Sequence, residues 1–213
     1  MLIRSKSQRN RGDTIIEVMF AVAIFSMVAV GSMGIMNNGT SIAQRSLELT
    51  LVRQQMDAQA EALRYVHHAY VAAYGSDAVN DFPASEWVKL LDDGLTKSSA
   101  STFGGDGCSS VPSQAFVMNA RTGRIHGGSI TPMNASNGRP FSQVVYQGDP
   151  DTGALSSTIE SVDGIWVEAV RSSSVAGDES GFIDFHIRAC WYSPASSAPS
   201  TLGTIVRLYE PRS

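Results

Sequence analysis

The longest apolar stretch of the chain lies near its N-terminus. Residues 18–36 are apolar or small, and no charged residue occurs between Glu17 and Arg45. A segment of about 20 apolar residues is long enough to cross the hydrocarbon core of a bilayer as a helix. The pattern therefore predicts a membrane-spanning helix over residues 13–36.

After a polar break, apolar residues recur at steps of three and four, which is typical of an amphipathic helix with one buried face. The stripe consists of Leu49, Val52, Met56, Ala60, Leu63, Val66 or His67, Tyr70 and Ala73. No proline precedes Pro83. We therefore expect one helix over residues 14–74, with Gly31, Gly34 and Gly39 as its weakest points.

Farther along the chain the period changes to two, which indicates strands. We expect a hairpin and four further strands, over residues 115–119, 123–126, 142–147, 164–172, 181–192 and 203–210. One strand alternates most clearly, with one face made of Ile183, Phe185, Ile187, Ala189 and Trp191. Such alternation favours an antiparallel sheet covered on one face. A short helix is expected over residues 85–91, with Ser85 as its cap and Gly94 as its stop.

These patterns predict an α+β fold in which a long N-terminal helical stem packs on an antiparallel sheet. The expected parts are a basic leader (1–12), a membrane or assembly helix (13–36), an amphipathic continuation (37–75) and an exported head (76–213). A length of 213 residues suits one such domain and a stem.

The leader is basic, with Arg4, Lys6, Arg9 and Arg11 and no acidic residue. By the positive-inside rule this end stays in the cytoplasm and the bulk of the chain is exported. Glu17 stands at the threshold of the apolar segment, where a charge costs about 2.5–3.5 kcal/mol on insertion scales. A carboxylate at that position needs a partner.

The order of basic leader, Gly12, Asp13-Thr14, two isoleucines, Glu17 and apolar run resembles the class III signal of type IV prepilins and pseudopilins, over roughly residues 4–45. The resemblance implies that a membrane peptidase cuts after Gly12. Asp13 then becomes an N-methylated N-terminus, at a position where the family usually carries Phe or Met. The apolar segment is kept as the assembly stem.

The resemblance also implies the function. Glu17 would pair with the N-terminal amine of a neighbouring subunit, so that Asp13, Thr14 and Glu17 set the register of assembly. The chain would be a minor pilin or pseudopilin, whose partners are other pilin subunits, the prepilin peptidase and the assembly platform. It would cross the cell membrane once, with its N-terminus in the cytoplasm, and enter an extracellular filament. Motility, adhesion, secretion and DNA uptake all stay open.

Two other functions compete with this interpretation. The chain could be an uncleaved membrane anchor whose head binds an extracellular ligand without polymerising. Residues 29–31 also have the small-x-small pattern of an ordinary signal peptidase site, and cleavage after Gly31 would release a secreted enzyme. No Gly-x-Ser-x-Gly elbow, P-loop or dinucleotide fingerprint occurs, so we expect neither an enzyme nor a cofactor.

Charge and cysteine content agree with export. Without its leader the chain has 12 basic and 20 acidic residues, which disfavours nucleic acid as a direct partner. The only two cysteines, Cys108 and Cys190, are expected to form one disulfide. The alternative is a pair of buried free thiols.

Three groups of residues invite a chemical interpretation. His67 and His68 are adjacent on a helix, about 100° apart, which suits a half-buried histidine better than a shared metal. His186 shares a strand face with Asp184 and Arg188, as expected for a row of surface ion pairs. Asp149 and Asp151 lie on a tight turn and are the one calcium candidate, but the turn sequence needs no metal.

Overall fold

The computed structural model describes residues 13–92, 95–97, 108, 110–128, 130–133, 139–149, 154–171, 181–193 and 198–211. It divides into two compact units, Met1–Arg45 and Ser46–Ser213. One helix, α1 (Asp13–Ala73), contributes to both units. The prediction of a single long helix is therefore confirmed, and the helix continues through all three of its glycines.

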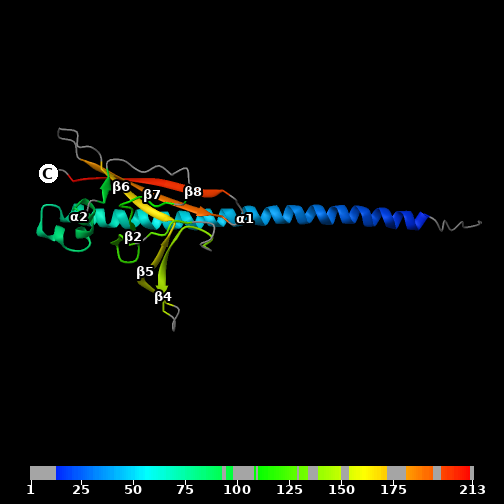
Figure 1. Ribbon diagram of the computed structural model, residues 1–213, viewed down its shortest axis with the longest axis horizontal. Helices are drawn as coiled ribbons and strands as arrows, with labels where there is room; N and C mark the ends of the chain where they lie inside the picture. The colour runs from blue at the N-terminus through cyan, green and yellow to red at the C-terminus, as the bar shows by residue number, and fades with distance from the viewer. Residues whose placement is uncertain are drawn as a thin grey trace, which may run out of the picture. The chain divides into compact units, whose positions relative to one another are not determined.

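The other elements all belong to the second unit and are labelled in Figure 1 where there is room. In chain order they are η1 (Asp77–Asn80), α2 (Ala84–Asp92), β1 (Thr96–Lys97), β2 (Val117–Asn119), β3 (Arg124–His126), β4 (Gln143–Gly148), β5 (Leu155–Asp163), β6 (Ile165–Arg171), β7 (Phe182–Tyr192) and β8 (Pro199–Tyr209). A long N-terminal helix followed by mainly antiparallel strands makes the fold α+β, as expected.

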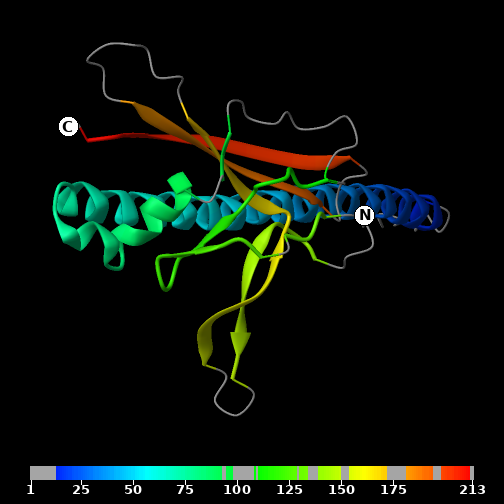
Figure 2. The same ribbon diagram turned by 60° about the vertical axis from the view of Figure 1, so that its left-hand side comes forward.

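The core of the second unit forms where α1 meets the largest sheet. The expected stripe on α1 is buried, with Val52, Leu63 and Val66 fully inaccessible to solvent. The sheet has the strand order β1-β6-β7-β8, and it lies along residues 46–73 of α1 in both views (Figure 1, Figure 2). Alternate side chains of β7 face this core, and Phe185 and Ile187 are completely buried. The alternation predicted for this strand is confirmed.

Glutamine side chains attach the smaller sheets to α1. The Gln59 amide nitrogen donates to the Met118 carbonyl at 2.8 Å, and its oxygen accepts from the Met118 backbone N–H at 2.6 Å. Gln59 therefore pairs with β2 as a neighbouring strand would. One turn earlier, Gln55 accepts from the backbone N–H of Val144 on β4 at 3.4 Å.

All six predicted strands are present, and the hairpin of β2 and β3 pairs antiparallel as expected. Two strands were not predicted. β5 pairs antiparallel with β4 in a two-stranded ribbon. β1 pairs parallel with β6 and forms one edge of the four-stranded sheet. The capping role of Ser85 is wrong, because α2 begins at Ala84 and Ser85 is already its second residue. The expected stop, Gly94, lies outside the described residues.

Candidate functional site: the apolar half of the long helix

The candidate site begins where α1 begins. Asp13 is the first helical residue and Thr14 follows it, although the structure describes the side chain of neither. Gly12 lies outside the described residues. Glu17 is in the second turn of the helix, and its side chain is exposed. Acidic groups near a helix N-terminus interact favourably with the helix dipole, so the helix itself tolerates this carboxylate.

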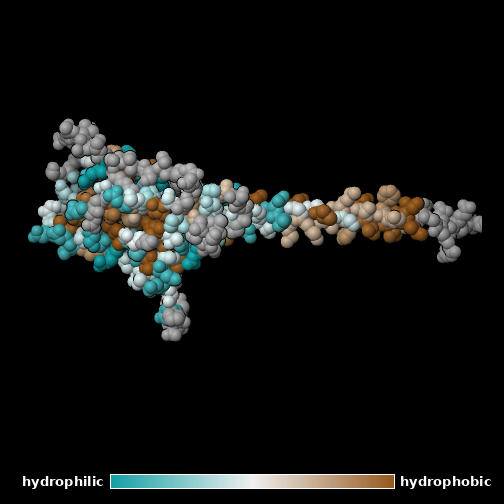
Figure 3. All heavy atoms as spheres, in the orientation of Figure 1, coloured by the Kyte–Doolittle hydropathy of each residue, from teal (hydrophilic) through white to brown (hydrophobic). Residues whose placement is uncertain are grey.

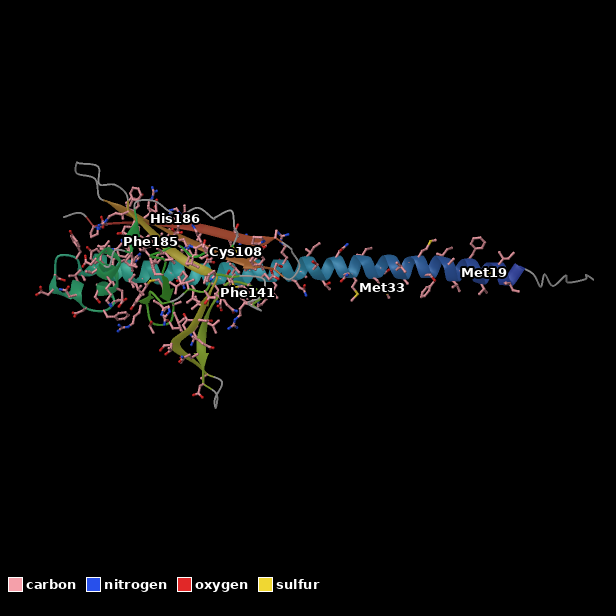
Figure 4. All side chains as sticks on the ribbon, viewed as in Figure 1. Met19, Met33, Cys108, Phe141, Phe185 and His186 are labelled. Atoms are coloured by element: carbon pink, nitrogen blue, oxygen red, sulfur yellow. A yellow bond between two sulfur atoms is a disulfide. The ribbon has the colours of Figure 1, made fainter. Side chains whose placement is uncertain are left out.

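Apolar side chains cover the helix beyond Glu17 on every side. Between Ile15 and Met36 the large hydrophobic residues expose 59% to 76% of their surface. Figure 3 shows this stretch as mostly brown, and in Figure 4 the side chains of Met19 and Met33 project away from the helix axis. By length and composition this is the helix of the described chain that qualifies as a candidate membrane span. An apolar surface all around a helix is typical of segments surrounded by lipid or by other helices.

The polar side chains within this stretch are bonded to their own helix. The Ser26 hydroxyl donates to the Val22 carbonyl at 2.7 Å, and the Ser32 hydroxyl donates to the Val28 carbonyl at 2.8 Å. A hydroxyl without a partner is costly in an apolar environment, and these bonds remove that cost. The segment from Val18 to Met36 is thus compatible with an environment that offers no hydrogen bonds.

A shallow apolar hollow adjoins Glu17. It has a volume of about 380 Å³ and is lined by Ile16, Met19, Phe20 and Ala23, which share one side of the helix. Glu17 follows Ile16 directly, so its side chain lies about 100° around the helix from the hollow.

The predicted disulfide is present in the second unit. Cys108 and Cys190 are bonded, with 5.3 Å between their Cα atoms, and both residues are buried. Cys190 belongs to the face of β7 that points away from α1 and is inaccessible to solvent, as are Trp166 and Glu168 of β6 on the same face of the sheet. A disulfide in a small domain is typical of exported proteins.

The histidines on α1 do not converge. The Nε2 atom of His67 lies 2.8 Å from the Tyr209 carbonyl, so it donates to the end of β8, and its ring packs on Trp87 with 4.8 Å between centroids. His68 is exposed, and the two histidine rings meet edge to face at 6.0 Å. His67 is therefore the half-buried structural histidine that was predicted.

The polar row on β7 pairs with neighbouring strands. Asp184 accepts two hydrogen bonds from Arg207 on β8, at 2.7 and 2.8 Å, and Arg188 lies 3.6 Å from Glu168 on β6. The Arg207 hydrogen bonds lower the pKa of Asp184. Burial lowers the pKa of His186, and the Arg188 charge lowers it further. Ion pairs are present as predicted, but they run across the sheet and not along the strand, and the Arg188–Glu168 pair is largely buried and not at the surface.

The calcium candidate is only partly described. The Asp149 backbone N–H donates to the Ala154 carbonyl at 2.8 Å and so closes the turn, whereas Asp151 lies outside the described residues. Within the described part of the chain, no group of three His, Cys, Asp or Glu residues is arranged to hold a metal ion.

Comparison of the chain with models of protein families, with curated proteins and with solved structures finds no match. The geometry of the chain itself therefore carries the functional argument.

Proposed function

We propose that this protein is a structural subunit, a minor pilin or pseudopilin, of a type IV pilus-like filament. Residues 13–36 would anchor it in the membrane and would later pack against the stems of other subunits in the fibre. The second unit would be displayed outside the membrane as the head. The role is structural and not enzymatic.

The single observation that carries the proposal is the position of Glu17. It is the one charged side chain of the helix between Asp13 and Arg45, and apolar residues surround it. A buried carboxylate without a counter-charge is strongly unfavourable, whereas a paired one is tolerable. A cation supplied by another subunit, such as the N-terminal amine released by cleavage after Gly12, would satisfy it.

Two further features support the proposal. The hydroxyls of Ser26 and Ser32 are bonded within the helix, which suits a segment that passes from lipid into a bundle of apolar stems. The Cys108–Cys190 disulfide suits a head that matures outside the cytoplasm.

The N-terminus of the protein purified from its native cell tests the proposal against its competitors. Mass spectrometry should show a mature chain that begins at Asp13. A chain that begins at Met1 would favour an uncleaved anchor with a ligand-binding head. A chain that begins at Ser32 would favour a released protein.

Substitution of Glu17 tests the pairing. Glu17→Ala should leave the protein in the membrane but strongly reduce its amount in sheared filaments. The matched control is Asp57→Ala, which removes an exposed carboxylate from the same helix and should not change incorporation. Normal incorporation of Glu17→Ala would contradict the proposed role of this carboxylate.

A further inference from the structure

A cleft in the second unit separates α1 from the turn between β2 and β3. Its volume is about 520 Å³, within the range of ligand and anchor pockets. Its lining consists of Ala58, Glu61, Ala62, Tyr65, Ala120, Arg121, Thr122 and Gly123. Small side chains therefore form much of the wall, and one tyrosine supplies an aromatic side.

Exposed aromatic and basic side chains surround this cleft. Tyr65 and Phe82 are 51% and 44% exposed, although such rings are usually buried. Both rings contact the turn at Gly123, where an added Cβ would lie 3.0 Å from Tyr65 and 3.6 Å from Phe82. The guanidinium of Arg124 lies over the Phe82 ring at 4.9 Å. We call Tyr65, Phe82, Lys89, Arg121 and Arg124 the aromatic–basic patch.

Contacts with Glu86 and Tyr146 hold the charged side chains of the patch in place. The buried Glu86 carboxylate binds Lys89 at 2.8 Å, lies 3.8 Å from Arg124, and accepts from the Ile125 backbone N–H at 3.0 Å. Arg121 lies over the Tyr146 ring at 4.6 Å. Side chains that are already fixed lose little entropy when a partner binds.

The turn that carries Arg121 is also fixed. The Asn119 side-chain oxygen accepts from the backbone N–H groups of Arg121 and Thr122, at 3.0 and 3.2 Å. Gly123 closes the turn with a φ of +70°, in the left-handed region that favours glycine. The cleft therefore keeps its form without a partner.

The charge of the patch is opposite to that of the exported chain. Three exposed cations belong to the patch, Lys89, Arg121 and Arg124, and the exposed Arg64 directly precedes Tyr65 on α1. The neighbouring acids are Glu61, which is paired with Arg64 at 2.5 Å, the buried Glu86, and the exposed Asp81, which directly precedes Phe82. Four cations against three acids leave this surface with an excess of one positive charge, whereas the chain beyond Gly12 has 20 acidic and 12 basic residues. Complementary charge favours an acidic partner.

We propose that the aromatic–basic patch and its cleft bind an acidic segment of another exported protein, with an apolar side chain of that segment anchored in the cleft beside Tyr65. Tyrosine, arginine and a pocket at the centre of a polar rim are typical of protein–protein hot spots. Nucleic acid fits less well, because it needs a longer basic track than these few cations and is repelled by the acidic chain. The proposal is independent of filament assembly and applies equally to an anchored protein.

Photo-cross-linking in the producing cells tests this proposal on the full chain. Tyr65 is replaced by the photoreactive p-benzoylphenylalanine. The matched control places the same residue at Tyr74, which directly follows the C-terminal end of the same helix, is 42% exposed and packs on Tyr70 at a ring distance of 5.8 Å. We expect an adduct from position 65, and not from position 74, with a protein segment rich in Asp and Glu.

Charge removal makes the test specific. Arg121→Gln with Arg124→Gln should lower the adduct yield about tenfold, the loss expected if two rim charge pairs together contribute roughly 1.4 kcal/mol. Arg53→Gln removes an exposed arginine of α1 outside the patch and should leave the yield unchanged. Added salt should lower the yield from the otherwise unaltered probe, which tests the charge dependence without risk to folding.

Three results would overturn the proposal. The first is a yield at position 65 no higher than at position 74. The second is an adduct that nuclease removes, which would identify nucleic acid as the partner. The third is an adduct whose yield responds neither to salt nor to the double arginine variant.

Discussion

The two halves of α1 have the same backbone conformation for different physical reasons. Between Ile15 and Met36 the large apolar side chains are exposed on all sides, whereas beyond Ser46 apolar positions such as Val52 and Leu63 are buried against the head. In the second half the apolar stripe is buried on one face and most charged residues lie on the opposite face. Glu48 is the exception, because it is buried and accepts a hydrogen bond from the Trp191 indole N–H at 3.2 Å. In the first half apolar side chains lie on all sides of the helix, so no single face is distinguished.

The difference shows which partner each half requires. The core of the second unit already covers its half of the helix. The first half exposes apolar surface on all sides and is, by length and composition, a candidate membrane span. A single helix can therefore join a folded head to a segment whose environment lies outside the chain.

The largest expected effect comes from one charge placed in each half. Leu63→Asp puts a carboxylate into the core, where an unpaired charge costs at least about 4 kcal/mol, so the second unit should unfold. Ile24→Asp should leave the head folded but weaken membrane integration by about 2.5–3.5 kcal/mol. Tryptophan fluorescence reports on the head alone, because Trp87, Trp166 and Trp191 are all buried there.

Carbonate extraction of membranes measures the second effect. The comparison would break down if Ile24→Asp shifted the fluorescence of the head, or if Leu63→Asp left that fluorescence unchanged.

Removal of the disulfide should affect one half only. Cys108→Ser with Cys190→Ser opens a link between residues 82 positions apart and should lower the free energy of unfolding of the head by about 2–4 kcal/mol. Membrane integration should not change, because neither cysteine belongs to α1. Urea unfolding followed by tryptophan fluorescence measures the first quantity, and an unchanged midpoint would contradict the prediction.

The amide of Gln59 offers a finer test of how the second half holds the head. Gln59→Ala leaves the N–H and C=O of Met118 without their partner in a buried position, which should cost about 2–3 kcal/mol of stability. Gln54→Ala, on the exposed face of the same helix, should change stability by less than about 0.5 kcal/mol. Equal unfolding midpoints for the two variants would show that Gln59 does not attach β2 to α1.

Sequence periodicity was sufficient to predict an element where that element repeats one pattern of apolar and polar residues along its length. The helix and β7 were predicted because each repeats its own period over many residues, and the burial of Val52, Leu63, Phe185 and Ile187 agrees with that period. β5 was missed because its ribbon with β4 extends away from the core (Figure 2). Ser156, Ser157 and Thr158 are all exposed there, so no apolar alternation marks the strand.

The Glu17 site and the aromatic–basic patch also differ in how far the sequence alone indicates them. The site around Glu17 is a prediction from the sequence, because its residues are consecutive and the order of charges and apolar residues is itself the signal. The aromatic–basic patch could not be predicted, because it combines residues of α1, the segment before α2, α2 itself, the β2–β3 turn and β3. Only the register of β2 on Gln59 brings Arg121 beside Tyr65.

The smallest expected effect concerns the pH dependence of the stability of the second unit. Burial, and secondarily the Arg188 charge, lowers the pKa of His186, while Asp184 and Glu168 act in the opposite direction. The unfolded chain, with an ordinary histidine pKa of about 6.5, then binds the proton more readily than the folded head. This contribution to stability is complete above about pH 6.5 and is lost as the pH falls below it. Urea unfolding at pH 7 and pH 5 should show that loss, and His186→Gln should reduce it; a variant with the same pH dependence as the unaltered protein would exclude His186 as its source.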